Sequence, residues 1–213
     1  NSMYLYQGGT FKDNFYKDVE IVKFSNIQFP ESVTKARSEM KNHPFNCNIT
    51  KPFQWHKLHV LNSYFKKWDY LFYIDCGMSI AKPVQTIIDL RKEGKIIAHS
   101  DAYPSFKWKL HLQFDKEFDK EWYQRLNQDH DLNCDYFQTG IMLFDTNIIT
   151  ETTFQEVYDL TCEYPLSRTN EQGMMALYFT DKKLWEPLPA KLGNLYTYDY
   201  KRRYGSNYVM WKY

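Results

Sequence analysis

The sequence predicts a single-domain α/β fold with a central sheet, mostly parallel but mixed, flanked by helices. Apolar runs rich in aromatic and β-branched residues alternate with helix-forming segments along most of the chain. These runs are nearly continuously apolar, which is typical of strands buried on both faces. The 213 residues are 43% hydrophobic, enough for a sizeable core. We therefore expect residues 1–213 to form one domain, which can be a fragment of a longer chain.

The first half of the chain supplies four predicted strands and three predicted helices. Proline marks the ends of the first helix, and apolar residues recur at helical spacing in the second. The strands fall at 3–6, 19–24, 70–74 and 96–99, and the helices at 32–42, 50–67 and 84–93.

The second half continues the alternation. A very polar helix with alternating charge is predicted over 115–131, and we assign it no chemistry. The next strand covers 136–144, where Gly140 predicts a bulge or a close backbone approach. Two helices follow, at 153–164 and 169–179, the second capped by Thr169 or Asn170. A short strand at 184–189 precedes an aromatic and basic tail.

Composition and charge exclude several classes of protein. Lys and Arg number 27 against 26 Asp and Glu, which argues against binding to nucleic acid through a broadly basic surface. No apolar run approaches the ~20 residues of a transmembrane helix. None of the four cysteines, Cys47, Cys76, Cys134 and Cys162, belongs to a C-x-x-C pair. We interpret them as reduced thiols and expect a cytoplasmic protein.

Polar residues stand at the ends of several predicted strands, where ligands bind in open α/β sheets. These residues are Asp75, Asp101, Gln138 and Thr139, with Glu171 and Gln172 opening a helix. Phosphate-binding and dinucleotide-binding glycine motifs are absent, as are the G-x-S-x-G and H-E-x-x-H motifs. His56 and His59 lie three positions apart but lack an evident third ligand, so they do not predict a zinc site.

The order of these segments resembles that of nucleotide-sugar glycosyltransferases of the GT-A type. Residues 71–77 resemble the strand that ends in an Asp-x-Asp motif, and 136–143 resemble the segment beneath the donor sugar. Residues 170–173 match an acid–Gln pair that opens a helix, and 188–194 resemble a closing Leu-Pro…Asn stretch. Lys57 stands 75 − 57 = 18 positions before Asp75, where the family places a basic residue. The chain also resembles glycosyltransferases of large algal viruses that decorate capsid proteins, which would place it in the host cytoplasm.

The resemblance implies a UDP-sugar donor, a glycan or glycoprotein acceptor and a divalent ion, Mn²⁺ or Mg²⁺. Two departures affect the metal. Gly77 replaces the second acid of Asp-x-Asp, and no histidine follows His130. Asp75, the donor phosphates and water would then hold the ion. The implied donor-binding residues are Gln7, Gly8, Thr10, Lys57, Asp75, Cys76 and Gly77.

Transfer leaves negative charge on the departing diphosphate, which cations stabilise as it develops. Lys57 is the first candidate, followed by Arg202 and Arg203 in the basic tail. An inverting enzyme needs a carboxylate base, for which Asp101, Asp135 and Glu171 are candidates. A retaining enzyme places a polar group such as Gln138 beneath the anomeric carbon. The segments around Gln138 and Glu171 resemble retaining families more closely, so we favour retention with Gln138, Glu171 and Asp101 as catalytic residues.

Two other functions stay open at this point. The loss of the second acid is compatible with a non-catalytic carbohydrate-binding module on a decayed transferase scaffold. A sugar nucleotidyltransferase would use a similar sheet, although residues 7–12 are a poor version of its glycine-rich basic loop. Fold alone does not separate these classes.

Overall fold

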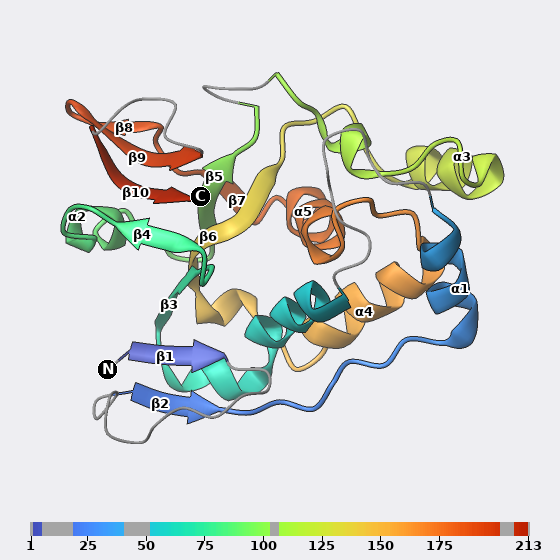
Figure 1. Cartoon of the computed structure of the whole chain (residues 1–213), viewed down its shortest axis with the longest axis horizontal. Coiled ribbons are helices and arrows are strands. Elements are labelled where there is room, and N and C mark those ends of the chain that lie inside the picture. Colours follow the sequence, from blue (N-terminus) through green and yellow to red (C-terminus); the bar gives the residue numbers. More distant parts are fainter. Residues whose placement is uncertain (1, 6–18, 41–51, 103–106, 201–206, 213) are drawn as a thin grey trace.

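The computed structural model describes residues 2–5, 19–40, 52–102, 107–200 and 207–212 (Figure 1). The strands are β1 (Ser2–Leu5), β2 (Val19–Val22), β3 (Tyr70–Ile74), β4 (Met78–Ile80), β5 (Ile96–Ser100), β6 (Phe137–Asp145), β7 (Trp185–Pro187), β8 (Lys191–Leu192), β9 (Leu195–Tyr200) and β10 (Tyr208–Lys212). The α-helices are α1 (Glu31–Glu39), α2 (Gln85–Ile88), α3 (Lys120–Asp129), α4 (Thr153–Glu163) and α5 (Glu171–Asp181). The 3₁₀ helices are η1 (Pro52–Leu61), η2 (Ser63–Lys67), η3 (Leu110–Gln113) and η4 (Thr146–Ile148).

The central sheet has the strand order β3-β6-β5-β7, which confirms the α/β class and the mixed sheet. Its pairing is less parallel than expected, because β6 runs antiparallel to both β3 and β5, and only β5 and β7 are parallel. Ser100 at the end of β5 pairs with Phe137 at the start of β6. The chain between them therefore leaves and re-enters the sheet at the same end, whereas a parallel pair needs a crossover to the opposite end.

The inner strands β5 and β6 of the central sheet are buried on both faces, as their apolar runs predicted, whereas β3 is half-buried. Met142 and Phe144 of β6 pack into a core cluster shared with α4, α5 and η1. Ile141 and Leu143, on the alternate face, pack against α2, β9 and β10. Figure 1 shows the helical layer and the C-terminal strands on different sides of this sheet. The result is a three-layer arrangement around β6.

The C-terminal tail forms a second sheet that the sequence did not lead us to expect. Its order is β4-β10-β9-β8, and β10 is parallel to β9 but antiparallel to β4. Residues 208–211 are buried, and Lys212 pairs in register with Met78. Since Met78 lies three positions after Asp75, this register carries the end of β10 to the end of β3.

The helix predicted over residues 50–67 is instead two 3₁₀ helices. Asn62 separates them with an extended backbone, and its side chain accepts a hydrogen bond from the Tyr64 amide at 2.9 Å. An Asn side chain that satisfies a backbone amide in this way competes with a continuous helix. Two other predicted helices are present but shorter: α2 has four residues, and α3 begins at Lys120 after Asp119 caps it.

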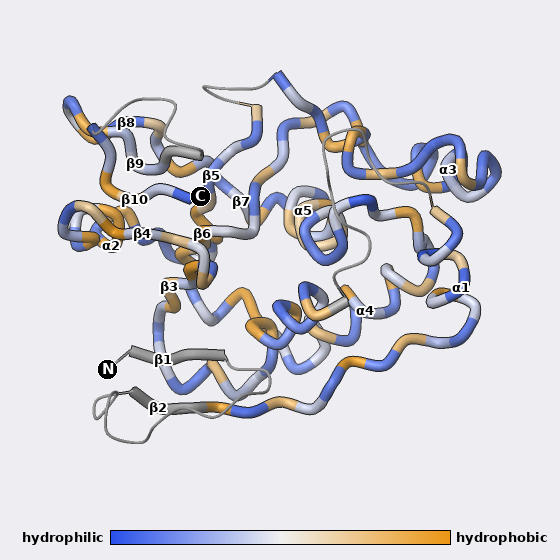
Figure 2. The backbone as a smooth tube through the Cα atoms, in the orientation of Figure 1, coloured by the Kyte–Doolittle hydropathy of each residue, from blue (hydrophilic) through white to orange (hydrophobic). Residues whose placement is uncertain are grey.

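Helix α3 is as polar as its sequence indicated. Figure 2 shows it as mostly hydrophilic with isolated hydrophobic positions, and Leu126 is its buried residue. Across the described part of the chain, no helix combines the length and the apolar character needed to cross a membrane. Cys76, Cys134 and Cys162 are free thiols, while Cys47 lies outside the described residues.

Candidate active site

A bulge shapes the end of the central sheet at which β3 and β5 finish. Ala98 pairs with Met142 and Ser100 with Phe137, so 100 − 98 = 2 steps along β5 span 142 − 137 = 5 steps along β6. Extra residues of β6 leave the ladder here, and such bulges re-aim side chains. Gly140 lies in the bulge, and a Cβ built on it would sit 3.4 Å from Asp75 Oδ2. The bulge that Gly140 predicted is confirmed.

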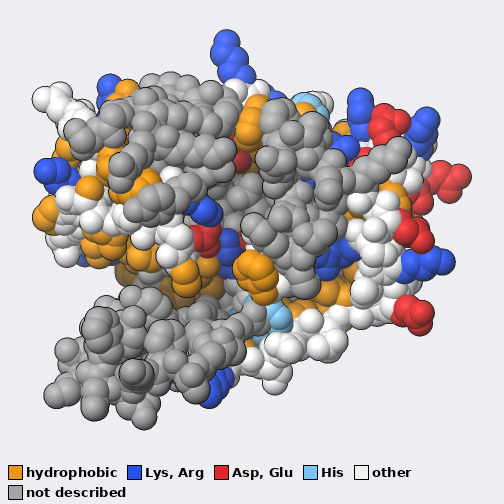
Figure 3. Space-filling view, in the orientation of Figure 1, with side chains coloured by type: hydrophobic (Ala, Val, Ile, Leu, Met, Phe, Trp, Pro, Cys, Tyr) orange, Lys and Arg blue, Asp and Glu red, His pale blue; other side chains and the backbone are white. Residues whose placement is uncertain are grey.

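The Asp75 carboxylate is held on both of its oxygens. Lys57 Nζ lies 3.0 Å from Oδ1, which also accepts a hydrogen bond from the Tyr73 hydroxyl at 2.9 Å. Lys212 Nζ lies 2.6 Å from Oδ2. Figure 3 shows acidic and basic side chains side by side near the middle of one face, next to atoms that are not described. The structure therefore brings the predicted Lys57 and Asp75 together and adds Lys212.

Lys57 joins Asp75 to a second carboxylate. Its Nζ lies 2.8 Å from Glu171 Oε1 and donates to Thr139 Oγ1 at 3.1 Å. Thr139 Oγ1 in turn donates to Glu171 Oε1 at 3.1 Å. The Glu171 side chain is only 3% exposed, and it opens α5, where the positive end of the helix dipole favours a carboxylate. Lys57 is therefore a buried cation between two acids.

The pKa shifts follow from this arrangement. Burial alone lowers the pKa of Lys57, but Glu171, Asp75 and Tyr73 together raise it above its ordinary value. Burial raises the pKa of Asp75, yet Lys57 and Lys212 more than offset this and hold it below its ordinary value. Both groups are consequently charged at neutral pH, so the cluster is an ion network.

A strained residue precedes Glu171. Asn170 has φ 55° and ψ −127°, a backbone conformation that a residue with a side chain rarely adopts. We had expected Thr169 or Asn170 to cap α5. Asn170 occupies the cap position, but its side chain makes no capping hydrogen bond. Instead Oδ1 accepts hydrogen bonds from Arg37 at 2.8 Å and from the Trp55 indole at 3.1 Å. These partners compensate for the strain and fix the start of α5, and with it Glu171.

Gln138 and Asp101 form a second polar pair beside the ion network. Gln138 Nε2 donates to Asp101 Oδ1, and Asp101 is 3% exposed. Because a carboxylate only accepts hydrogen bonds, the amide nitrogen of Gln138 must face Asp101, and its carbonyl oxygen Oε1 is directed elsewhere. The pair and the ion network meet at adjacent residues of β6, Gln138 and Thr139.

Other predicted residues fall at different places. Cys76 and Gly77 are exposed in the turn after Asp75, where the Met78 amide donates to the Asp75 carbonyl at 3.1 Å. Asp135 is on the surface in an ion pair with Lys109 at 2.6 Å and does not join the site. Gln7, Gly8, Thr10, Arg202 and Arg203 lie outside the described residues.

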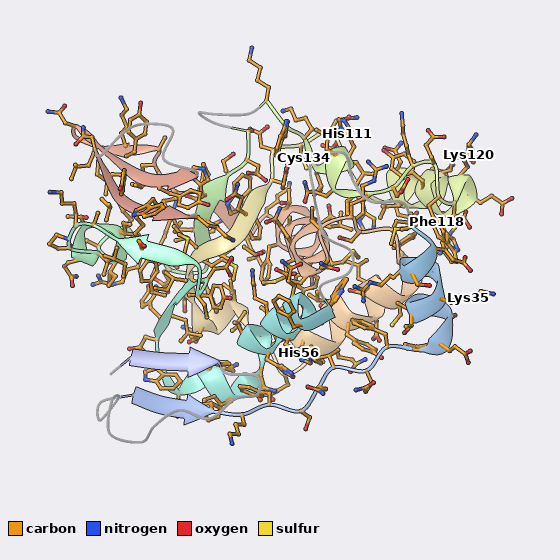
Figure 4. All side chains as sticks on the ribbon, in the orientation of Figure 1. Lys35, His56, His111, Phe118, Lys120 and Cys134 are labelled. Atoms are coloured by element: carbon orange, nitrogen blue, oxygen red, sulfur yellow. The ribbon has the colours of Figure 1, made fainter. Side chains whose placement is uncertain are left out.

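The two histidines considered for zinc are structural. Their rings stack at 5.8 Å, as expected for residues three apart on a 3₁₀ helix. His56, labelled in Figure 4, accepts a hydrogen bond from the Ile27 amide at 3.4 Å, and His59 Nε2 contacts the Ser25 carbonyl at 2.8 Å. Within the described ranges, no three His, Cys, Asp or Glu side chains are grouped so as to hold a metal ion.

The residues around Asp75 are a poor fit for Mn²⁺ or Mg²⁺. Such an ion would have to share the Asp75 carboxylate with the ammonium groups of Lys57 and Lys212, which already occupy both oxygens. Two like unit charges about 4 Å apart repel by about 4 kcal/mol at an effective dielectric constant of about 20, and a divalent ion doubles this. Gly77, at the position of the second acid, contributes no ligand.

Sequence reasoning missed Lys212, Tyr73 and Arg37 as site residues. A signal for Lys212 was present, because it directly follows the apolar run 208–211, which reads as a strand. Arg37 carried no comparable signal. It lies 133 residues before Asn170, and only the folded chain brings the two together.

Comparisons with known proteins bear on the fold. No family model matches the chain, and no curated protein matches its sequence. Among solved structures, the chain is similar to the apo form of WbbM, a bifunctional glycosyltransferase, with a TM-score of 0.53 and 13% identity over 94% of this chain. The match covers 36% of that protein, so the chain spans about a third of its length. The likeness shows that the chain shares its fold with part of that glycosyltransferase.

A second similar structure is the apo form of mouse xyloside xylosyltransferase 1. The match covers 92% of this chain and 75% of that one at 9% identity, with a TM-score of 0.47. This score is too low to establish a shared fold by itself.

Proposed function

We propose that the protein is a glycosyltransferase that moves a sugar from a UDP-sugar to a hydroxyl of a glycan or glycoprotein acceptor. The observation that carries the proposal is the Lys57–Asp75 ion pair at the carboxyl end of β3, within a glycosyltransferase fold. Ligands of open α/β sheets bind at this end of the strands. A lysine fixed there is suited to the negative charge of a nucleoside diphosphate.

The reaction requires stabilisation of a leaving group. The bond between the anomeric carbon and the diphosphate oxygen breaks, and a bond from that carbon to the acceptor oxygen forms. The acceptor's hydroxyl proton passes to an oxygen of the departing diphosphate. Lys57 is held in place by Asp75 and Glu171 before the charge develops, so little reorganisation is needed.

The geometry favours retention over inversion. An inverting reaction needs a carboxylate that can reach an acceptor hydroxyl. Glu171 is 3% exposed and bound to Lys57 and Thr139, and Asp101 is 3% exposed and bound to Gln138. Gln138 is half-buried, and its Oε1 is directed away from Asp101. That oxygen is suited to stabilise a positive anomeric carbon, with Asp101 as the group that positions it.

Release of UDP from a panel of UDP-sugars, with and without simple glycan acceptors, tests the proposal. The key variant is Gln138→Ala, and the matched control is Gln155→Ala. Gln155 also donates its amide to an aspartate, Asp159 at 2.7 Å, but on the exposed face of α4. We expect Gln138→Ala to lower the rate by about 100-fold, while Gln155→Ala keeps the full rate.

Three results would contradict the proposal. UDP binding without UDP release from any sugar donor would favour a non-catalytic binding module. Formation of pyrophosphate from a nucleoside triphosphate and a sugar phosphate would favour a nucleotidyltransferase. Equal rates for the two glutamine variants would remove Gln138 from the reaction.

A further inference from the structure

We infer that the diphosphate of the donor binds to Lys212 and Lys57 without a divalent metal ion, and that Asp75 serves to hold these two lysines rather than a metal. The inference rests on the proposed function, since it concerns the donor of that same reaction. It departs from the metal-assisted mechanism that the resemblance implies.

The first argument is the state of the Asp75 carboxylate. Oδ1 is bound by Lys57 at 3.0 Å and by the Tyr73 hydroxyl at 2.9 Å, and Oδ2 is bound by Lys212 at 2.6 Å. A metal ion at Asp75 would therefore have to displace an ammonium group or lie beside one. Because Gly77 replaces the second acid, this turn would offer a metal ion one carboxylate, that of Asp75.

The second argument is the pair of donors beside Lys212. The backbone amides of Cys76 and Gly77 have no hydrogen-bond partner among the described residues, and both residues are exposed. They lie in the turn that the Met78 amide closes onto the Asp75 carbonyl. Successive unpaired amides in a turn favour an anion. A Cβ built on Gly77 would meet nothing within 4 Å, so the turn is open to a ligand.

The third argument is that a ligand can take Lys212 from its protein partner more easily than it can take Lys57. Lys57 is 11% exposed and shared among Asp75, Glu171 and Thr139, so it stays in place. The Lys212 side chain is 34% exposed, and Asp75 is its polar partner among the described residues. A phosphate can therefore exchange with Asp75 for Lys212, because Asp75 keeps Lys57 and Tyr73. Lys212 then supplies charge to the diphosphate that a metal ion would otherwise supply.

The decisive measurement is UDP affinity by calorimetry in EDTA and again in excess Mn²⁺. A metal that shared the site would tighten UDP binding by a large factor, because coupled ligands change each other's affinity equally. We expect UDP to bind in EDTA with an affinity within about threefold of that in Mn²⁺. Binding that disappears in EDTA would overturn the inference.

A variant of the lysine on Oδ2, with a matched control, sharpens the test. Lys212→Met should raise the Kd for UDP by about tenfold or more, because it removes a charge-assisted contact to phosphate. Lys92→Met is the matched control. Lys92 is also paired with a carboxylate, Glu186 at 2.7 Å, but it lies just before the start of β5, whereas the site lies where β5 ends. An equal effect of the two variants, or none from Lys212→Met, would contradict the inference.

Asp75→Asn separates the two mechanisms by the sign of its effect. If Asp75 held a metal, this variant would abolish UDP binding. If Asp75 competes with phosphate for Lys212, the variant should tighten UDP binding by about threefold or more in EDTA. Thermal unfolding of each variant without ligand establishes that it is folded.

Failure of this inference and failure of the proposed function give different results. Turnover of a UDP-sugar that requires Mn²⁺ would overturn the inference and leave the glycosyltransferase proposal standing. UDP binding that resists EDTA and depends on Lys212, without turnover of any donor, would support the inference and contradict the proposed reaction.

Discussion

The two lysines that meet at Asp75 come from opposite sides of the central sheet and are held in different ways. Lys57 comes from η1 in the helical layer, is 11% exposed and contacts two carboxylates. Lys212 comes from β10 in the C-terminal sheet, is 34% exposed and contacts one. The comparison teaches that one ion pair is part of the folded core and the other lies at its rim. Removal of Lys57 should therefore lower the stability more than removal of Lys212 does, whereas removal of Lys212 should act mainly on UDP binding.

The largest expected effect on stability is that of Lys57→Met. It removes one of the two cations on Asp75 and the ammonium group that lies 2.8 Å from buried Glu171, which should cost about 3–5 kcal/mol of unfolding free energy. Urea denaturation measures it, with the exposed Lys66→Met as control. The double variant Lys57→Met, Glu171→Gln should regain about 1 kcal/mol or more, because it removes the uncompensated charge. A loss no greater than that of Lys66→Met would place Lys57 outside the core network.

The next effect is a pH dependence of the unfolding free energy, which arises from His99 on the side of the C-terminal sheet. Burial lowers the pKa of His99 to about 4, and its ring packs on Tyr198 of β9 at 4.7 Å. In the unfolded chain His99 takes up its proton near the ordinary histidine pKa of 6.5, so stability should fall as the pH drops from 6.5 towards 4. The full contribution is about 3 kcal/mol.

Denaturation midpoints of wild type and His99→Phe across this pH range isolate that contribution from His56 and His59, whose pKa values burial also lowers. The stability of wild type relative to that of His99→Phe should fall on acidification, because only wild type has to protonate His99. A constant difference would mean that His99 is not held neutral between the two sheets.

A smaller effect is expected at the start of α5 on the helical side. A Cβ at Gly173 would lie 2.5 Å from Ser167 Oγ and 3.3 Å from both Gln113 Cβ and Thr169 Oγ1. Ser167 is held by a hydrogen bond to the Asn170 carbonyl at 2.6 Å, so it does not move freely. Gly173→Ala should cost about 1–3 kcal/mol. Gly77→Ala, with open space around it, should change the free energy of unfolding by less than about 0.5 kcal/mol.

Among the lysine variants, the smaller expected effect on stability is that of Lys212→Met, despite its expected effect on UDP binding. An ion pair at the rim contributes about 0–1 kcal/mol, and less at high salt. Thermal unfolding at low and high ionic strength measures it. If Lys212→Met cost as much as Lys57→Met, the two ion pairs would be equivalent and the distinction between core and rim would fail.

Much of the fold could be read from local patterns. The strand at 70–74 matches β3 to the residue, and the bulge at Gly140 follows from a glycine inside an apolar strand. The placement of polar residues after strands brought Asp75, Gln138 and Asp101 to one end of the sheet. These features are local, because backbone propensity and side-chain alternation act over a few neighbouring residues.

Partner choice could not be read in this way. No local pattern in the segment between Ser100 and Phe137 indicates that the chain returns to the same end of the sheet and that β6 therefore runs antiparallel to β5. The tail 192–213 shows its aromatic content but not that it pairs with β4.

By itself the sequence determined the α/β class, the acid at the end of β3 and the absence of a second acid beside it. The tertiary structure decided what that acid binds. Lys57 lies 18 positions before Asp75 and Lys212 lies 137 after it. A contact across such a separation depends on how layers pack around the central sheet, and no local pattern encodes that packing. The run that ends in Asp75 therefore predicted where the site lies, and only the fold surrounded it with two cations.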